Sequence, residues 1–174
     1  MEIRALKNPD FDSIFPLWQE AFGDSRPTAQ RYFTAIVPYS TLFVILDENI
    51  PVSMLYSVEE QVSSHKISYI YAVATAKSHR GQGLAAKLLA FAEDSAREAG
   101  ASACILCPAE PSLAAYYGRL GYESWSAAGK ICGEGNTVPD AIRTLDGSET
   151  PVFAMAKIFD PSFPKIGTFR YSMG

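Results

Sequence analysis

The sequence has few cysteines, no long apolar run and no cluster of basic residues, and each absence excludes a class of protein. Three cysteines among 174 residues give an odd count that argues against a disulfide framework. Cys104 and Cys107 lie within an apolar run without a second Cys or His pair at ligand spacing, so a buried strand is favoured over a metal site. We therefore expect reduced thiols and no bound metal.

The lack of a long apolar run and of a basic cluster also argues against membranes and nucleic acids as partners. No apolar stretch reaches the roughly 18 residues of a membrane span, and the first residues lack the apolar core of a signal peptide. The formal net charge is −4 and basic residues are scattered, whereas nucleic-acid-binding proteins gather them in patches. A cytoplasmic location is the default expectation.

The length and the apolar pattern favour one α/β domain over residues 1–174, with helices on both faces of a mixed sheet. Three β-rich runs with short connections predict antiparallel neighbours, and a strand–helix–strand crossover predicts a parallel pair. Pro16 restricts the start of the first helix, because proline is easily accepted only in a first turn. The predicted strands are 2–6, 41–46, 50–62, 66–74, 103–107, 152–158 and a further one near 169–173; the predicted helices are 11–22, 28–37, 83–99 and 112–120, with a helical turn near 140–144 in an irregular segment.

Residues 67–100 contain the most informative pattern, an apolar strand followed by a glycine-rich turn that opens a helix. The first amides of a helix have no partner within it, and the helix dipole makes them partly positive. Gly81 and Gly83 allow an anion to approach this backbone closely, and Arg80 adds a fixed positive charge. The pattern predicts a site for a pyrophosphate.

Three kinds of anion-binding loop compete for this stretch. The phosphate loop of nucleotide hydrolases requires Gly-Lys-Ser/Thr, which occurs nowhere in the chain. A dinucleotide fingerprint fits residues 81–86 by letter, but the loop follows an antiparallel meander and no acid follows the next strand to hold a ribose. A dinucleotide-dependent oxidoreductase therefore stays open as a minor alternative. The third candidate is an acyl-CoA loop.

The segment Arg80-Gly81-Gln82-Gly83-Leu84-Ala85 resembles the Arg/Gln-x-x-Gly-x-Gly/Ala signature of the GNAT superfamily of N-acetyltransferases. Its surroundings are similar too: Tyr71-Ala72-Val73 resembles the fourth strand of that fold, and residues 116–122 resemble its Tyr-x-x-x-Gly-Phe/Tyr segment. Residues 17–23 and the Tyr-Gly-Arg-Leu-Gly-Tyr segment at 117–122 resemble the branch related to enhanced-intracellular-survival proteins, of which only the N-terminal domain would be present.

This resemblance implies a sheet of about six or seven strands whose fourth and fifth strands splay apart to admit pantetheine. It implies acetyl-CoA as the cosubstrate and a small-molecule or peptide amine as the acceptor. A non-catalytic acyl-CoA-binding or regulatory module is the alternative from another class. The implied cofactor-binding residues are Tyr71, Ala72 and Val73 beside the thioester, with Val73 as oxyanion donor, and Arg80, Gly81, Gln82, Gly83, Leu84 and Ala85 around the pyrophosphate.

Tyr117 stands four residues before Gly121, where the family has its general acid. A phenol with a pKa near 10 can protonate a departing thiolate without prior activation. Tyr116 points elsewhere on a helix and is the poorer candidate.

The general base is less well defined by the sequence. Some relatives use a glutamate on the strand after the cofactor helix, but this strand reads Cys-Ile-Leu-Cys. Glu59 and Glu60 alternate faces on a strand bordering the acceptor cleft, so only one can point inward. Glu59 and Glu110 are the candidates for the base.

The two leading helices supply candidate acceptor residues and further core. Glu20 and Asp24 are positioned to hold a cationic acceptor, whereas Trp18, Phe22 and Tyr32 are expected in the core. The apolar tail at 163–173 is compatible with a homodimer contact or with a role on its own sheet.

Overall fold

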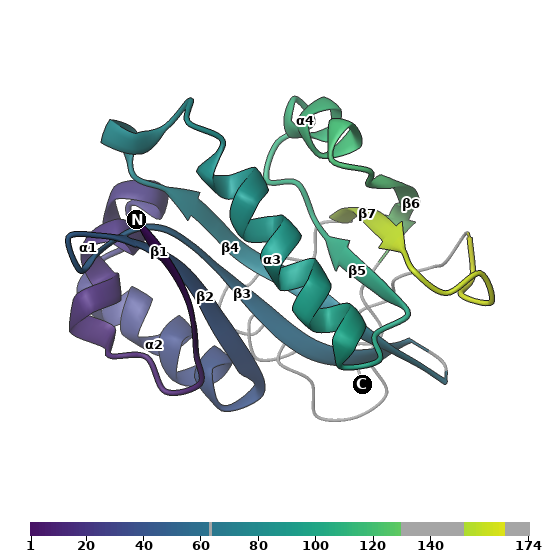
Figure 1. Ribbon diagram of the computed structural model, residues 1–174, viewed down its shortest axis with the longest axis horizontal. Coiled ribbons are helices and arrows are strands. Elements are labelled where there is room, and N and C mark those ends of the chain that lie inside the picture. Colours follow the sequence, from purple (N-terminus) through teal and green to yellow (C-terminus); the bar gives the residue numbers. More distant parts are fainter. Residues whose placement is uncertain (63, 130–151, 166–174) are drawn as a thin grey trace.

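The computed structural model describes residues 1–62, 64–129 and 152–165, and its strands form one mixed sheet (Figure 1). The seven strands are ordered β1-β2-β3-β4-β5-β7-β6. The first four form an antiparallel meander, β4 and β5 are parallel, and β7 lies antiparallel between β5 and β6. The strands are β1 (Glu2–Leu6), β2 (Ser40–Asp47), β3 (Ile50–Val62), β4 (His65–Thr75), β5 (Ala103–Leu106), β6 (Glu123–Gly129) and β7 (Val152–Ile158).

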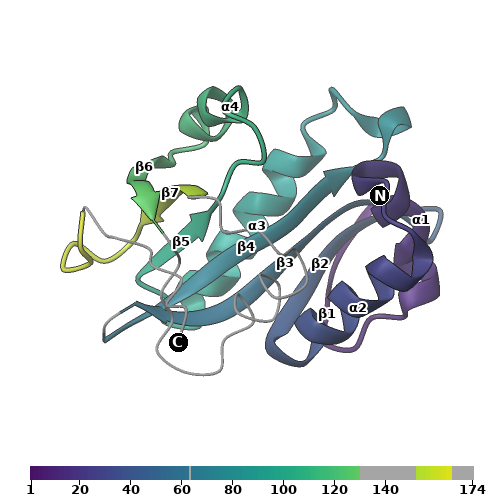
Figure 2. The same ribbon diagram turned by 180° about the vertical axis from the view of Figure 1, so that it is seen from behind.

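Helices cover both faces of the sheet, as the two opposite views show (Figures 1 and 2). Helices α1 (Phe11–Phe22) and α2 (Arg26–Ile36) pack on one face, and α3 (Leu84–Glu98) packs on the other. Strand alternation supplies both cores: Leu42 and Val44 of β2 face α1 and α2, while Phe43 and Ile45 face α3. The remaining helical elements are η1 (Val37–Tyr39), η2 (Lys77–His79) and α4 (Leu113–Arg119). The predicted fold class is confirmed.

Helix α1 covers the predicted residues 11–22 although Pro16 was expected to restrict its start, and α2 starts earlier than predicted. Asp10 caps α1 by accepting a hydrogen bond from the Ser13 amide, so Pro16 lies inside the helix and not in its first turn. The second helix begins at Arg26, two residues earlier than predicted, because Ser25 caps it and Pro27 is accepted in the first turn.

The segment around α4 also departs in detail. Ser112 was expected to cap this helix, but its hydroxyl makes no cap hydrogen bond and donates instead to Glu110. Gly121 follows the helix with φ of 92°, and a Cβ there would lie 3.3 Å from Cε of Lys157. The left-handed backbone conformation therefore favours glycine at this position, and a larger residue would also have to displace the Lys157 side chain.

Strand β4 has a bulge just beyond the end of its pairing with β5. Leu55 of β3 faces two residues of β4, Ala72 and Val73, where the register shifts. Ala72 has φ of 52°, a left-handed conformation that is unfavourable for a residue with a side chain. Pairing between β4 and β5 covers only Ile67–Ile70 against Ala103–Leu106. Beyond these pairs the two parallel strands diverge, which is the predicted splay.

The end of the chain was the least predictable part. The predicted strand at 152–158 is confirmed as β7, whereas β6, which pairs with it, was not predicted. The expected helical turn near 140–144 and the strand near 169–173 lie outside the described residues. Within the described part of the chain, no helix combines the length and the apolar character needed to cross a membrane.

Candidate functional site

A cavity of about 380 Å³ opens where β4 and β5 diverge. It reaches from the gap between the strands to the first two helices and to α4. Tyr71, Ala72 and Val73 all line it, and neither Ala72 nor Val73 has a register partner in β3 or β5. The other described residues around it are Trp18, Phe22, Asp24, Tyr32, Tyr69, Ile70, Leu106, Cys107, Ala109, Leu113 and Tyr117.

The glycine-rich loop leads from η2 into α3 with an alternating backbone handedness. Gly81 and Gly83 have φ of 77° and 72°, and Gln82 between them is not left-handed. Such alternation directs successive N–H groups toward one side and forms an anion-binding concavity. Gly83 occupies the cap position of α3 and supplies no side-chain oxygen. The described residues therefore leave the first amides of α3 without a side-chain cap, and a Cβ on either glycine would meet open space.

Leu84 and Arg80 show how this loop is fixed to the protein. The Leu84 side chain is buried in the core on the α3 side, so only its backbone is available to a ligand. Nε of Arg80 donates a hydrogen bond of 3.1 Å to the Thr75 carbonyl, which holds the guanidinium against the turn. Glu20 accepts a hydrogen bond from the Lys77 amide and thus connects η2 to α1, so its carboxylate is used in the scaffold.

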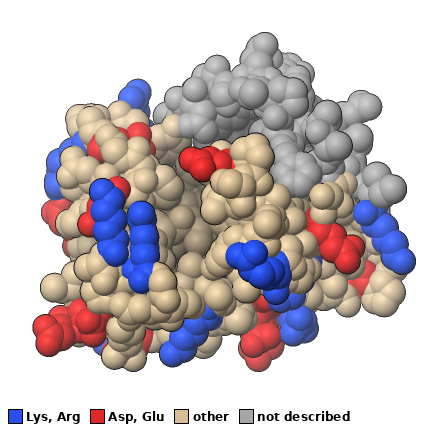
Figure 3. Space-filling model, turned by 90° about the horizontal axis from the view of Figure 1, so that it is seen from above, with Lys and Arg blue, Asp and Glu red and all other residues tan. Residues whose placement is uncertain are grey.

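The end of the molecule that carries η2 and α4 is hollowed between two lobes (Figure 3). Lys and Arg side chains lie on both sides of this hollow (Figure 3). Lys77, Arg80 and Arg119 are the exposed cations of η2, the loop and α4. Positive charge around uncapped helix amides is the environment that a diphosphate requires.

Tyr117 of α4 lies on the opposite wall of the cavity from β4 and is 8% exposed. Burial, and secondarily the neighbouring Tyr116, raises the pKa of Tyr117 to about 12. Its ring packs edge-on against those of Tyr116 and Tyr122, at centroid distances of 5.2 and 6.0 Å. The phenol is thus a protonated donor at neutral pH, and its neighbours fix its ring.

Cys107 follows β5 and is the cysteine that lines the cavity among the described residues. Burial raises the pKa of its thiol to about 12, with a smaller opposing effect from a hydrogen bond to Tyr69. A cysteine nucleophile must be a thiolate, and this one stays protonated near neutral pH.

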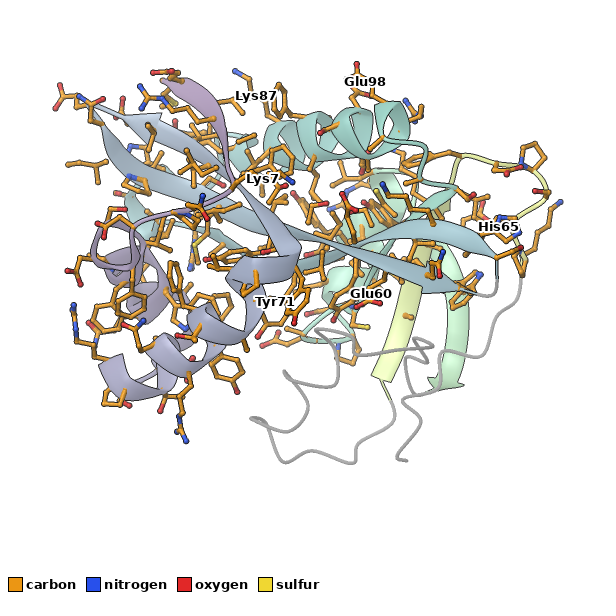
Figure 4. The ribbon with its side chains drawn as sticks, turned by 90° about the horizontal axis from the view of Figure 1, so that it is seen from below. Lys7, Glu60, His65, Tyr71, Lys87 and Glu98 are labelled. Carbon is orange, nitrogen blue, oxygen red and sulfur yellow. The ribbon has the colours of Figure 1, made fainter. Side chains whose placement is uncertain are left out.

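The structure does not bring the two candidate bases to the cavity. Glu59 is exposed and forms an ion pair with Lys66 at 3.4 Å. Glu60 is the inward member of the pair, 8% exposed, on the same face of the sheet as Tyr71 and opposite the face of α3 (Figure 4). Glu110 is exposed and accepts a hydrogen bond from Ser112.

The first two helices contribute more to the cavity than the sequence indicated. Trp18 belongs to the core as expected, with 3% exposure, and Tyr32 packs against that core, whereas Phe22 is 43% exposed. All three also line the cavity. Asp24 lines it as well, with Oδ2 accepting a hydrogen bond of 2.8 Å from Nε1 of Trp18. Helical periodicity identifies the apolar face of a helix, but it does not indicate where two strands of the underlying sheet diverge. The sequence pattern therefore cannot distinguish residues that line the cavity from residues that are only part of the core.

The comparisons with known proteins agree with this geometry. Residues 2–125 match the family model described as the acetyltransferase (GNAT) domain, and the chain belongs to this family. It is an acetyltransferase, and acetyl-CoA is its cosubstrate. This result decides among the three anion-binding loops in favour of the acyl-CoA loop. Among curated proteins, none matches the sequence significantly.

Solved structures show the same fold at low sequence identity. A crystal structure described as an N-acetyltransferase from Lactobacillus plantarum is 22% identical, with a TM-score of 0.63 over 90% of this chain and 97% of the other. The ribosomal-protein-S18-alanine N-acetyltransferase of Escherichia coli is 13% identical, with a TM-score of 0.64 over 95% and 98%. A chain of the NatC complex, solved with Gag peptide and CoA, is 19% identical, with a TM-score of 0.60 over 91% and 99%. The particular branch, the cytoplasmic location and the dimer stay predictions.

Proposed function

We propose that this acetyltransferase transfers the acetyl group of acetyl-CoA to a primary amine in one direct step. The observation that carries the proposal is the juxtaposition of three features around one cavity: the splayed residues of β4, the uncapped start of α3 and Tyr117. Residues 80–85 hold the pyrophosphate, and the thioester lies beside Val73, whose amide donates to the carbonyl oxygen.

In this reaction the neutral amine nitrogen attacks the thioester carbonyl carbon, the new C–N bond forms and the C–S bond breaks. Tyr117 gives its proton to the departing CoA sulfur, and the phenolate is neutralised by the proton that the amine nitrogen loses. Making an amine of pKa ~10.4 neutral near pH 7 costs about 4–5 kcal/mol, which desolvation within the largely apolar cavity helps to supply. Glu59 and Glu110 require a bridging water or a chain movement to act as the base.

The direct test is thiol release from acetyl-CoA with a panel of amines, together with calorimetric titration of acetyl-CoA alone. We expect saturable acetyl-CoA binding and amine-dependent thiol release. Tight acetyl-CoA binding without thiol release for any small amine, polyamine or peptide amine would contradict transfer to an amine and favour an acyl-CoA-binding module.

Gly83→Ala is expected to weaken acetyl-CoA binding on the order of tenfold, because a methyl group in the left-handed cap position turns the α3 amides away from the anion. Losing one hydrogen bond to a charged group costs about 1.5–3 kcal/mol. The left-handed conformation adds a stability loss of about 1–2 kcal/mol.

Gly100→Ala is the matched control for this prediction. Gly100 also has a left-handed conformation, with φ of 85° and open space at its Cβ, but it lies at the other end of α3. Both variants should lose similar stability in urea titrations, and only Gly83→Ala should lose affinity in calorimetry. Equal affinities of the two variants would remove the loop from the cofactor site.

A further inference from the structure

The wall that α1 and α2 give to the cavity is aromatic. Trp18 is at the centre of this wall, with its ring 5.0 Å from that of Phe22, 5.9 Å from that of Tyr32 and 6.4 Å from that of Tyr71, measured between centroids. Tyr69 continues the wall, with its ring 6.3 Å from that of Tyr71. Packing at these distances fixes the rings in place, so the wall offers a preformed surface for another flat apolar group.

One charged side chain stands among the described residues of this cavity, the carboxylate of Asp24. Its Oδ2 atom is held at 2.8 Å by Nε1 of Trp18, which fixes the carboxylate against the aromatic wall. No lysine or arginine is among the described residues that line the cavity. The cavity therefore attracts a single cation, through the carboxylate and through the faces of the rings.

These features restrict the acceptor more narrowly than the family does. A ring-sized apolar body is favoured because the wall replaces water with aromatic contacts. A polycation is disfavoured because it would bring further charges into an apolar cavity with one carboxylate.

We propose that the acceptor is a monoamine with one positive charge and an apolar, ring-sized body, of the arylalkylamine class. This inference rests on the proposed acetyl transfer to an amine. The ring packs against Trp18 and Phe22, and the Asp24 carboxylate attracts the ammonium form into the cavity before the nitrogen loses its proton.

Acceptor preference of the full chain at saturating acetyl-CoA tests the proposal. 2-Phenylethylamine, ethanolamine, spermidine and a short peptide with a free amino terminus are compared by thiol release. We expect kcat/KM for 2-phenylethylamine to exceed each of the others by at least about tenfold, the ratio that one well-packed ring supplies. A higher value for any of the other three would overturn the arylalkylamine inference while leaving acetyl transfer intact. Acetyl-CoA binding with no thiol release for any amine would overturn both.

Asp24→Asn removes the negative charge but keeps the hydrogen bond to Trp18, because an amide oxygen still accepts it. The variant therefore tests the charge of Asp24 apart from its structural contact. We expect KM for 2-phenylethylamine to rise about tenfold, as for the loss of one charged partner, with the dissociation constant of acetyl-CoA unchanged. Asp12→Asn, on the exposed side of α1 in an ion pair with Arg26, should change neither value.

Phe22→Ala tests the ring contact with a residue that is 43% exposed and therefore tolerates truncation. The preference for 2-phenylethylamine over ethanolamine should shrink severalfold. An unchanged preference in this variant, together with an unchanged KM in Asp24→Asn, would show that the acceptor binds elsewhere.

Discussion

Tyr117→Phe is expected to lower kcat by about 10²- to 10⁴-fold, the usual contribution of a positioned general acid. The variant keeps the ring, which is 8% exposed and packs edge-on against the Tyr122 ring. It removes only the hydroxyl that protonates the CoA sulfur. The dissociation constant of acetyl-CoA should stay unchanged in calorimetry, since Phe preserves the shape of the cavity wall. Thiol-release kinetics at saturating acetyl-CoA measure kcat.

Tyr116→Phe is the control, because Tyr116 is the neighbouring tyrosine on the same helix and does not line the cavity. It should retain kcat within a few fold. Wild-type turnover in Tyr117→Phe would exclude the phenol as the proton donor. An equal loss in both variants would indicate a distortion of α4.

The pH dependence of kcat/KM distinguishes the ionisation of Tyr117 from that of the acceptor amine. Burial raises the pKa of Tyr117 to about 12, so the phenol stays protonated over the range in which a primary amine loses its proton, with a pKa near 10.4. The value of kcat/KM should therefore rise with pH up to about pH 10, without a falling limb from the tyrosine. Tyr117→Phe should keep the rising limb at a lower level. A falling limb below about pH 10 in the wild type alone would contradict the raised pKa of Tyr117.

Most of the fold could be predicted because local signals agree with it. Period-two runs, short turns and left-handed glycines such as Gly100 determine the meander and the crossover. Pro16 does not restrict the start of α1 as expected, because Asp10 caps the helix well before the proline. Strand β6 could not be predicted because it is stabilised by pairing with β7, about two dozen residues further along the chain, and not by its own sequence pattern.

Some features of the candidate site were likewise predictable from the sequence, and others were not. The loop at Gly81 and Gly83 was predictable because glycine is the residue that a left-handed backbone requires. The bulge at Ala72 was not, because an alanine within an apolar strand gives no sign of a positive φ. The cavity-lining role of the aromatic residues around Trp18 could not be predicted either, because helical periodicity does not indicate where β4 and β5 diverge.

Glu93→Ala is the variant with the largest expected effect on stability. Glu93 of α3 is 4% exposed and accepts hydrogen bonds from the Tyr122 hydroxyl at 2.8 Å and from Nζ of Lys157 at 2.5 Å. Truncation leaves a half-buried ammonium and a buried hydroxyl without their acceptor. We expect the free energy of unfolding in urea to fall by about 3 kcal/mol, at the low end for a broken buried pair, because Lys157 keeps some contact with water. Asp94→Ala, which removes the adjacent exposed ion pair with Arg97, should cost less than about 1 kcal/mol.

The same cluster connects stability to the site, because Tyr122 follows α4 and its amide donates to the Tyr117 carbonyl at 3.1 Å. Glu93→Ala should therefore also reduce kcat under conditions where the variant is folded, with acetyl-CoA affinity retained at the distant loop. Adding Lys157→Met removes the unpaired charge and should recover part of the lost stability, but not kcat, since Tyr122 still lacks its acceptor. If the double variant is no more stable than Glu93→Ala, the loss comes from the cavity left by the side chain and not from the charge on Lys157. If kcat is unaffected in both variants, the contact between Tyr122 and Tyr117 does not hold the catalytic phenol.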